Sequence, residues 1–347
     1  MLDSLKKTFF LLIISFALIL CSCSSGGEDQ VPRAEVNATL LRIGDNKIAL
    51  KKALILVLGQ KDMIESTYGS DIWNVSLSEK NLDELVKEKI KIRIGMIYTG
   101  SLLAGSRGIK LDHDEEILSA SAADYLFAKL STADREELKL SADELYDIYF
   151  SYRLAVCGYK TLLDEAEIEV SRDEARIIRL ARIKVSTMGL SGADLSLKKA
   201  RLSEAAQKIA DGADFGAVAS EYDENGKTEM YAARGELPPK EEEIAFSLNE
   251  GEVSSVFESD DSLVIIKCLD SYDEVRSDAA RERITSEKQS AYYIEALEDF
   301  LKKNPLIWND AVWNSLDLSA ISYKTDSNFF EVYDMFFPET ADGGDQR

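Results

Sequence analysis

Apolar residues recur at helical spacing through the first half of the chain. After a short strand-like piece, "TLLRI", and a Gly-Asp-Asn turn, the pattern predicts successive amphipathic helices. Asp112 and Ser141 each stand three residues before a glutamate, so each is expected to cap a helix. The clearest helical stripe comprises Leu82, Leu85, Val86, Ile90, Ile94 and Ile97. Residues 32–175 are therefore predicted to be mostly helical, with Ser78 or Asn81 capping the helix that carries this stripe.

The pattern changes near Glu174, where arginines alternate with β-branched residues and a strand is expected. A helix should follow and close at Gly212, and a second short helix should begin at Asp214. The segment "KTEMYAARGELPPKEEE" is predicted to be a loop before the short helix in "IAFSLNEGEVSSVF". The continuous apolar run "SLVIIKCLD" is typical of a strand inside a sheet. Residues 178–272 therefore predict a compact α+β unit within a larger, mostly helical α+β protein.

Residues 273–305 read as one long polar helix that ends at Pro305. Its apolar stripe is too thin to stabilise an isolated helix in water, so the helix is expected to pack on the 32–175 segment. Residues 306–347 contain an aromatic cluster, "FFEVYDMFF", and a polar end. They are assigned only as a C-terminal tail.

The chain has 347 residues and a formal net charge of −22, with 45% hydrophobic residues. This length allows two or three domains. Nucleic acid is not an expected partner, because binding to it needs a basic face. The acidic surface favours solubility and basic or neutral partners.

The N-terminus predicts export. Lys6 and Lys7 precede the apolar run "TFFLLIISFALIL", which suits a signal-peptide core. The run ends in "LCSC", which resembles a bacterial lipobox with Cys23 as the lipidated residue. Cys21 is a weaker alternative because the large Leu20 precedes it, and a plain signal peptide or an uncleaved anchor is the other alternative. We expect a signal peptide at 1–22, a flexible tether at 23–31 and an extracytoplasmic protein anchored to the lipid bilayer through Cys23.

Few residues offer metal or thiol chemistry. Beyond the leader, Cys157 and Cys268 are the remaining cysteines, and each lies in an apolar pattern typical of a free buried thiol. The one histidine, His113, is expected at the surface or at a helix cap. The sequence shows no zinc-ligand spacing, so no metal or other cofactor is expected.

Three motifs in the second region, "GADFGAVASEY", "RGEL" and "IAFSLNEGEVSSVF", occur in an order and spacing that resemble the parvulin-type peptidyl-prolyl isomerase domain. With a lipobox, a helical N-terminal segment and a returning helix, the whole chain is similar to the secreted foldases and chaperones of the PrsA and SurA kind. The resemblance implies a helical chaperone module with an inserted parvulin unit. It also implies that unfolded exported polypeptides are the partners.

The resemblance also locates departures from the family's site. Parvulins place a histidine in the first strand and another in the last, and the matching positions here are Ile183 and Val264. An acid or thiol position falls near Asn225, beside Asp223 and Glu224. A pocket phenylalanine is replaced by Glu241, whose burial without a partner would be costly. The residues expected to remain as substrate-binding walls are Leu237 and Phe246, with Tyr231 as the only ring nearby.

Isomerisation of an Xaa-Pro bond needs a dry pocket that binds the twisted amide more tightly than the planar one. The replaced positions predict weak or absent isomerase activity in a membrane-anchored foldase. Two alternatives stay open: an active peptidyl-prolyl isomerase, and a lipoprotein that acts as a structural adaptor in the envelope.

Overall fold

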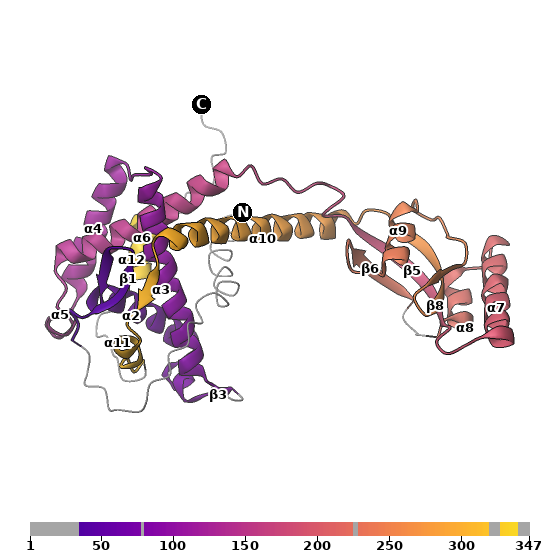
Figure 1. Ribbon diagram of the computed structural model, residues 1–347, viewed down its shortest axis with the longest axis horizontal. Helices are drawn as coiled ribbons and strands as arrows, with labels where there is room; N and C mark the ends of the chain where they lie inside the picture. The colour runs from indigo at the N-terminus through magenta and orange to yellow at the C-terminus, as the bar shows by residue number, and fades with distance from the viewer. Residues whose placement is uncertain (1–34, 78–79, 225–227, 319–326, 339–347) are drawn as a thin grey trace. The chain divides into compact units, whose positions relative to one another are not determined.

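The computed structural model describes residues 35–77, 80–224, 228–318 and 327–338. The predicted signal peptide, the tether and Cys23 lie outside these residues. The chain divides into two compact units (Figure 1), one formed by Met1–Glu167 with Gln289–Arg347 and one by Ile168–Lys288. Each is described by itself. Within the described ranges, every helix is too short or too polar to cross a membrane.

The first unit contains a small antiparallel sheet in the order β2-β1-β9. Its strands are β1 (Thr39–Ile43), β2 (Asn46–Ala49) and β9 (Leu306–Trp308). The predicted Gly-Asp-Asn turn connects β1 to β2, and Gly44 adopts a φ of 56°, which glycine tolerates without a Cβ clash. The sheet thus joins residues near both ends of the described chain.

Five helices make up most of this unit: α2 (Leu50–Tyr68), α3 (Leu82–Ser106), α4 (His113–Lys129), α5 (Thr132–Leu138) and α6 (Ala142–Glu165). Between α2 and α3 lie the 3-10 helix η2 (Ser70–Asn74) and the short hairpin of β3 (Ser76–Leu77) and β4 (Lys80–Asn81). Asp112 and Ser141 form capping boxes at the starts of α4 and α6, as predicted. Helix α3 begins directly after Asn81, and Ser78 lies outside the described residues.

The long helix α10 (Glu274–Lys303) belongs to both units, with the division after Lys288. Its second half packs in the first unit, where Tyr293 and Leu297 join a core cluster with Met96 of α3 and Leu162 of α6. A Cβ on Gly100 would clash with the Tyr293 hydroxyl. Glycine at this position therefore permits the close contact between α3 and α10.

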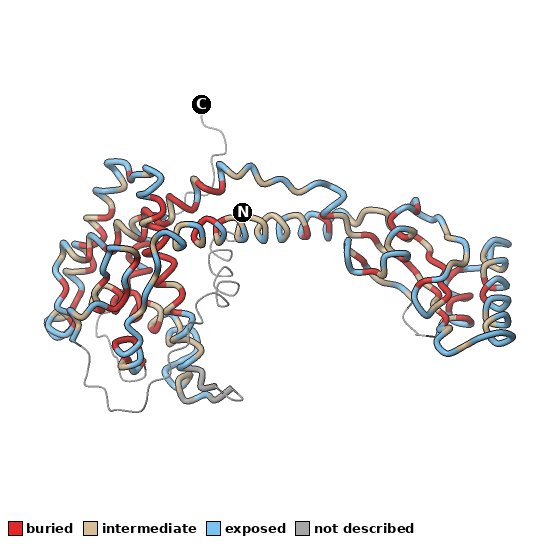
Figure 2. Tube along the Cα trace, viewed as in Figure 1, coloured by how far each residue is buried: buried red, intermediate tan, exposed pale blue. Residues whose placement is uncertain are grey.

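The segment assigned as a C-terminal tail is structured in its described parts, 306–318 and 327–338. It forms β9, α11 (Asp310–Asn314) and α12 (Phe329–Phe336). The ring of Phe329 is fully buried and stacks on Tyr149 with centroids 4.2 Å apart. This burial explains why the aromatic residues gather there: they complete the core of the first unit (Figure 2).

The second unit is built on a four-stranded antiparallel sheet in the order β6-β5-β8-β7. Its strands are β5 (Ile177–Ser186), β6 (Glu229–Ala233), β7 (Phe257–Ser259) and β8 (Ser262–Asp270). The run "SLVIIKCLD" forms β8 inside the sheet, as predicted. Strand β6 is a correction, because its residues were predicted to be part of a loop.

Helices cover both faces of this sheet. Helices α7 (Gly192–Ala210) and α8 (Phe215–Tyr222) pack on one face, which we call the α8 face. Helix α9 (Pro239–Ser247) packs on the other, the α9 face. Gly212 follows α7 with a φ of 99°, and Asp214 caps α8 by accepting a hydrogen bond from Ala217 N. Both boundaries agree with the sequence prediction.

Candidate functional site

The α9 face holds most of the residues that the sequence assigned to a substrate pocket. Because side chains alternate along a strand, Arg182 and Lys184 of β5 lie on this face, directly opposite Ile266 and Val264 of β8. Leu237 and Phe246 pack in the same cluster as Val264. The site therefore combines an apolar cluster with two cationic side chains.

The structure separates the two positions matched to the family's histidines. Ile183 pairs with Ile265 and is buried on the α8 face with Phe215, whereas Val264 is buried on the α9 face. The expectation that Ile183 and Val264 underlie one site is therefore wrong. A one-residue shift along a strand moves a side chain to the opposite face. The β5 side chains nearest to Val264 on the α9 face are those of Arg182 and Lys184.

Glu241 is the central residue of the α9 face. Its side chain is 0% exposed, and its two carboxylate oxygens accept separate bonds of 2.7 Å from Arg182 Nη1 and Lys184 Nζ. Burial raises the pKa of the Glu241 carboxyl, but the hydrogen bonds and positive charges of Lys184 and Arg182 outweigh burial, and the pKa lies below its ordinary value. The cost of burying this charge is thus offset by two partners that the sequence analysis did not assign.

Leu237 and Phe246 are core residues in this structure, with 7% and 6% of their surface exposed. The Phe246 ring is flanked by the guanidinium groups of Arg234, at 4.1 Å, and Arg176, at 5.4 Å. Arg176 also donates a hydrogen bond of 3.1 Å to the Phe246 carbonyl. These contacts cover the Phe246 ring, which was predicted to be a wall of the substrate pocket.

Tyr231 is not part of the cluster that contains Leu237 and Phe246. It lies on β6 opposite Arg179, on the α8 face, and is 40% exposed. Its ring is covered by the guanidinium group of Arg276, whose carbon lies 3.7 Å from the ring centroid. The assignment of Tyr231 to the same pocket as Leu237 and Phe246 is therefore wrong.

Asn225 lies outside the described residues, but its neighbours have structural roles. Asp223 accepts a hydrogen bond of 2.8 Å from the backbone N–H of Lys184, and Glu224 accepts one of 2.9 Å from the backbone N–H of Ser186. These carboxylates accept hydrogen bonds from backbone N–H groups of β5, in the part of the strand that extends beyond its pairing with β6. Asp223 and Glu224 are therefore bonded to the edge of the sheet and are not part of the apolar cluster on the α9 face.

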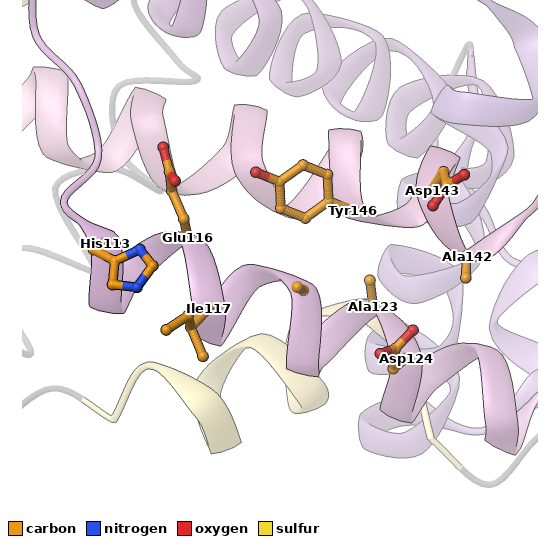
Figure 3. A pocket seen from close by; sticks show the side chains of 9 residues that line it. His113, Glu116, Ile117, Ala123, Asp124, Ala142, Asp143 and Tyr146 are labelled. Atoms are coloured by element: carbon orange, nitrogen blue, oxygen red, sulfur yellow. The ribbon is translucent and has the colours of Figure 1, made fainter.

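A second candidate site is a groove of about 390 Å³ between α4 and α6 of the first unit (Figure 3). Its floor contains alanines, Tyr146 and Ile117, which is 50% exposed. Three carboxylates line it, those of Glu116, Asp124 and Asp143, and none has an ion-pair partner in the described part of the chain. The groove offers apolar surface and negative charge.

His113 also lines this groove (Figure 3) and is exposed, while the N-cap of α4 is Asp112. In the part of the chain that the structure describes, no three histidine, cysteine or acidic side chains are placed to hold a metal ion. Cys157 and Cys268 are free thiols, as predicted. Burial raises the pKa of Cys157 to about 11, so its reactive thiolate is scarce near neutral pH.

Residues 183–270 match the family model described as "Rotamase: PPIC-type PPIASE domain". This range covers the sheet, α7, α8 and α9. The second unit therefore contains a parvulin-type peptidyl-prolyl isomerase domain.

Relatives extend the likeness beyond this domain. The chain is 43% identical over 75 residues to the foldase protein PrsA of Oceanobacillus iheyensis, a match that covers 20% of this chain and 25% of that relative. It is 23% identical over 327 residues to PrsA of Caldanaerobacter subterraneus, covering 87% of this chain and 95% of the relative. The chain is thus a PrsA-like protein that carries a parvulin-type domain.

A crystal structure of PrsA from Lactococcus lactis shares 13% identity, covering 80% of this chain and 97% of that one, with a TM-score of 0.32. A score this low does not establish the arrangement of the whole chain. The α+β fold class rests on the helices and sheets described above and on the family match.

Proposed function

We propose that this protein is an extracytoplasmic foldase that binds unfolded segments of exported proteins and whose parvulin-type domain has weak or lost isomerase activity. The similarity to PrsA proteins supports the foldase class and the extracytoplasmic location. The lipobox-like "LCSC" supports lipidation at Cys23 and attachment to the bilayer.

The observation that carries the proposal of weak activity is the triad in which the buried Glu241 carboxylate is bonded by the partly exposed side chains of Arg182 and Lys184. An isomerase lowers a barrier of about 18–20 kcal/mol by binding the twisted amide in a dry pocket. Here the α9 face is filled by an ion pair and by the covered rings and methyl groups of Phe246 and Leu237. Opening it would expose paired charges and separate buried apolar groups.

Each 1.4 kcal/mol of lost transition-state binding lowers the rate about tenfold. A site that must open before it binds substrate pays this opening cost in every turnover. The filled α9 face therefore supports the proposal of weak activity without any change in the fold of the domain.

The groove between α4 and α6 supports client binding by the first unit. Ile117 and Tyr146 offer apolar contacts to an unfolded segment, and Glu116, Asp124 and Asp143 favour segments that carry lysine or arginine. The net charge of −22 favours solubility of a complex with an unfolded client that exposes apolar side chains. The first unit has its own core, so binding there does not require the parvulin-type domain.

The test is a deletion of residues 178–272 that joins Ile177 to Asp273. The Ile177 carbonyl already accepts a hydrogen bond of 2.8 Å from Asp273 N–H, so the new peptide bond spans a short gap. Suppression of client aggregation should be largely kept. Loss of that suppression, with retention by the isolated second unit, would reverse the assignment of the two units. Co-purification with one stoichiometric partner and no suppression would favour a structural adaptor.

A further inference from the structure

The outer edge of β6 is open within the described chain. Strand β6 ends the sheet and pairs only with β5, with Leu180 opposite Met230 and Ile178 opposite Ala232. Arg182 N–H donates to the Thr228 carbonyl, which fixes the alternation of hydrogen-bonded pairs. Met230 and Ala232 therefore bond to β5, and the backbone groups of Glu229, Tyr231 and Ala233 point outward.

The outward groups of Ala233 already have a partner. Its N–H donates to Glu236 Oε2 at 2.8 Å, and its carbonyl accepts from Glu236 N–H at 3.3 Å. The outward N–H and carbonyl of Tyr231 have no such bond to a described residue. Tyr231 is thus the point at which another strand would find a free donor and a free acceptor.

Beside this edge lies a groove of about 370 Å³ between β6 and the first turns of α10. The small side chains of Ala279 and Ala280 form part of its wall, and Arg276 and Arg283 supply two guanidinium groups. Each arginine has an acidic partner close in sequence: Arg276 pairs at 3.1 Å with Asp273, which directly precedes α10, and Arg283 pairs at 2.7 Å with Glu287 of α10.

The Arg283–Glu287 pair is exposed, and such a pair contributes little to stability, so Arg283 can exchange its partner for an incoming carboxylate at low cost. Asp273 is only 15% exposed and stays with Arg276, but the half-exposed guanidinium of Arg276 has further N–H donors for a second carboxylate. In a chain with a net charge of −22, a groove lined by two arginines and one glutamate, Glu236, is less acidic than the chain as a whole.

We propose that this edge and groove bind an extended polypeptide segment that carries an aspartate or glutamate, by adding it as a strand to β6. Main-chain hydrogen bonds to Tyr231 would give affinity that is independent of sequence. An added strand lies about 4.8 Å from its neighbour, so a carboxylate beside Tyr231 on the α8 face comes within reach of Arg276.

This inference deepens the proposed function, because it rests on the protein's binding unfolded clients. It gives the parvulin-type domain a way to hold extended client segments on a surface separate from the closed α9 face. It also distinguishes the two units by charge: the α4–α6 groove favours basic segments, and the β6 edge favours acidic ones.

The test uses the chain from residue 24 onward and a fluorescein-labelled peptide of alternating valine and aspartate, with a matched peptide of alternating valine and lysine. Anisotropy measures the Kd of each. The aspartate peptide should bind, and Arg276→Ala should weaken it about fivefold, as expected for an exposed charge pair. The matched control is Arg281→Ala, which removes an arginine of the same helix that does not line the groove and should leave the Kd unchanged.

Tyr231→Pro removes the outward N–H at an edge position where proline is tolerated. It should abolish binding, while Tyr231→Ala, which keeps the N–H, should retain most of it. Hydrogen exchange should also show that the aspartate peptide protects the Tyr231 amide. Equal binding by wild type and Tyr231→Pro, or no protection of this amide, would overturn the inference.

The same preparations are assayed for suppression of client aggregation. A wild-type chain that suppresses aggregation but does not bind the aspartate peptide refutes the β6 site and leaves the proposed function standing. A protein that binds the peptide but suppresses no aggregation retains the β6 site and refutes the proposed function.

Discussion

The α9 face of the second unit and the α4–α6 groove of the first unit use carboxylates in opposite ways. Glu241 is fully buried and bonded at both oxygens, whereas Glu116, Asp124 and Asp143 line an open groove without ion-pair partners in the described chain. A buried carboxylate must be satisfied by the protein, but an exposed one is satisfied by water and stays available to a ligand. The comparison supports our proposals that the α9 face of the second unit is structural and that the α4–α6 groove of the first unit binds clients.

The largest effect should come from removing the buried Glu241 carboxylate. Glu241→Ala leaves Arg182 and Lys184, whose side chains are 19% and 21% exposed, without their shared partner, and the loss of hydrogen bonds between charged groups costs about 1.5–3 kcal/mol. Urea unfolding of the second unit should show this loss. Glu243→Ala is the control, because Glu243 lies on the same helix in an exposed pair and should change stability by less than about 0.5 kcal/mol. Equal small effects at both positions would contradict the structural role of the triad.

The same carboxyl should make the second unit sensitive to acid. Its folded pKa lies below the ordinary value of 4.5, so the stabilisation is fully present above about pH 4.5 and is lost as the pH falls through the folded pKa. Because other carboxyls also titrate there, the measurement is the difference in unfolding free energy between wild type and Glu241→Gln from pH 7 to pH 3. The difference in unfolding free energy should become smaller as the pH falls. A difference that stays constant would show that the Glu241 carboxylate is not the source of the acid sensitivity.

A smaller effect, on peptide affinity, is expected from changes in the α4–α6 groove. Replacing Glu116, Asp124 and Asp143 with their amides should leave stability unchanged and weaken binding of a lysine-rich apolar peptide by about tenfold at low salt, with less salt dependence than wild type. The control neutralises three exposed acids of the same unit, Glu136, Glu137 and Asp164. If both triple variants lose affinity equally, the net charge of the unit and not the groove accounts for binding.

Local signals allowed much of the fold to be predicted. The capping boxes at Asp112 and Ser141, the end of α7 at Gly212 and the buried strand β8 all depend on residues within a few positions of one another. Strand β6 was missed because five residues with two alanines carry little strand propensity. The C-terminal aromatic residues gave no local sign that their partner is Tyr149, which lies 180 residues away from Phe329.

The site was less predictable for the same reason. Glu241 is 59 and 57 residues from Arg182 and Lys184, so the bonds that make its burial tolerable depend on tertiary pairing. The cations themselves were visible as alternating residues within an apolar strand, a pattern that indicates a charged partner on one face. Ile183 lies between Arg182 and Lys184, and a difference of one residue along a strand changes the face completely, so its face could not be predicted without the tertiary structure.

The most direct test of the closed α9 face is the rate at which the chain from residue 24 onward isomerises a standard Xaa-Pro peptide. The account predicts a rate close to the uncatalysed one, and little change in Leu237→Ala or Phe246→Ala variants that remain folded. A rate typical of parvulins that falls in either variant would show that Leu237 and Phe246 line a working pocket and would contradict the account.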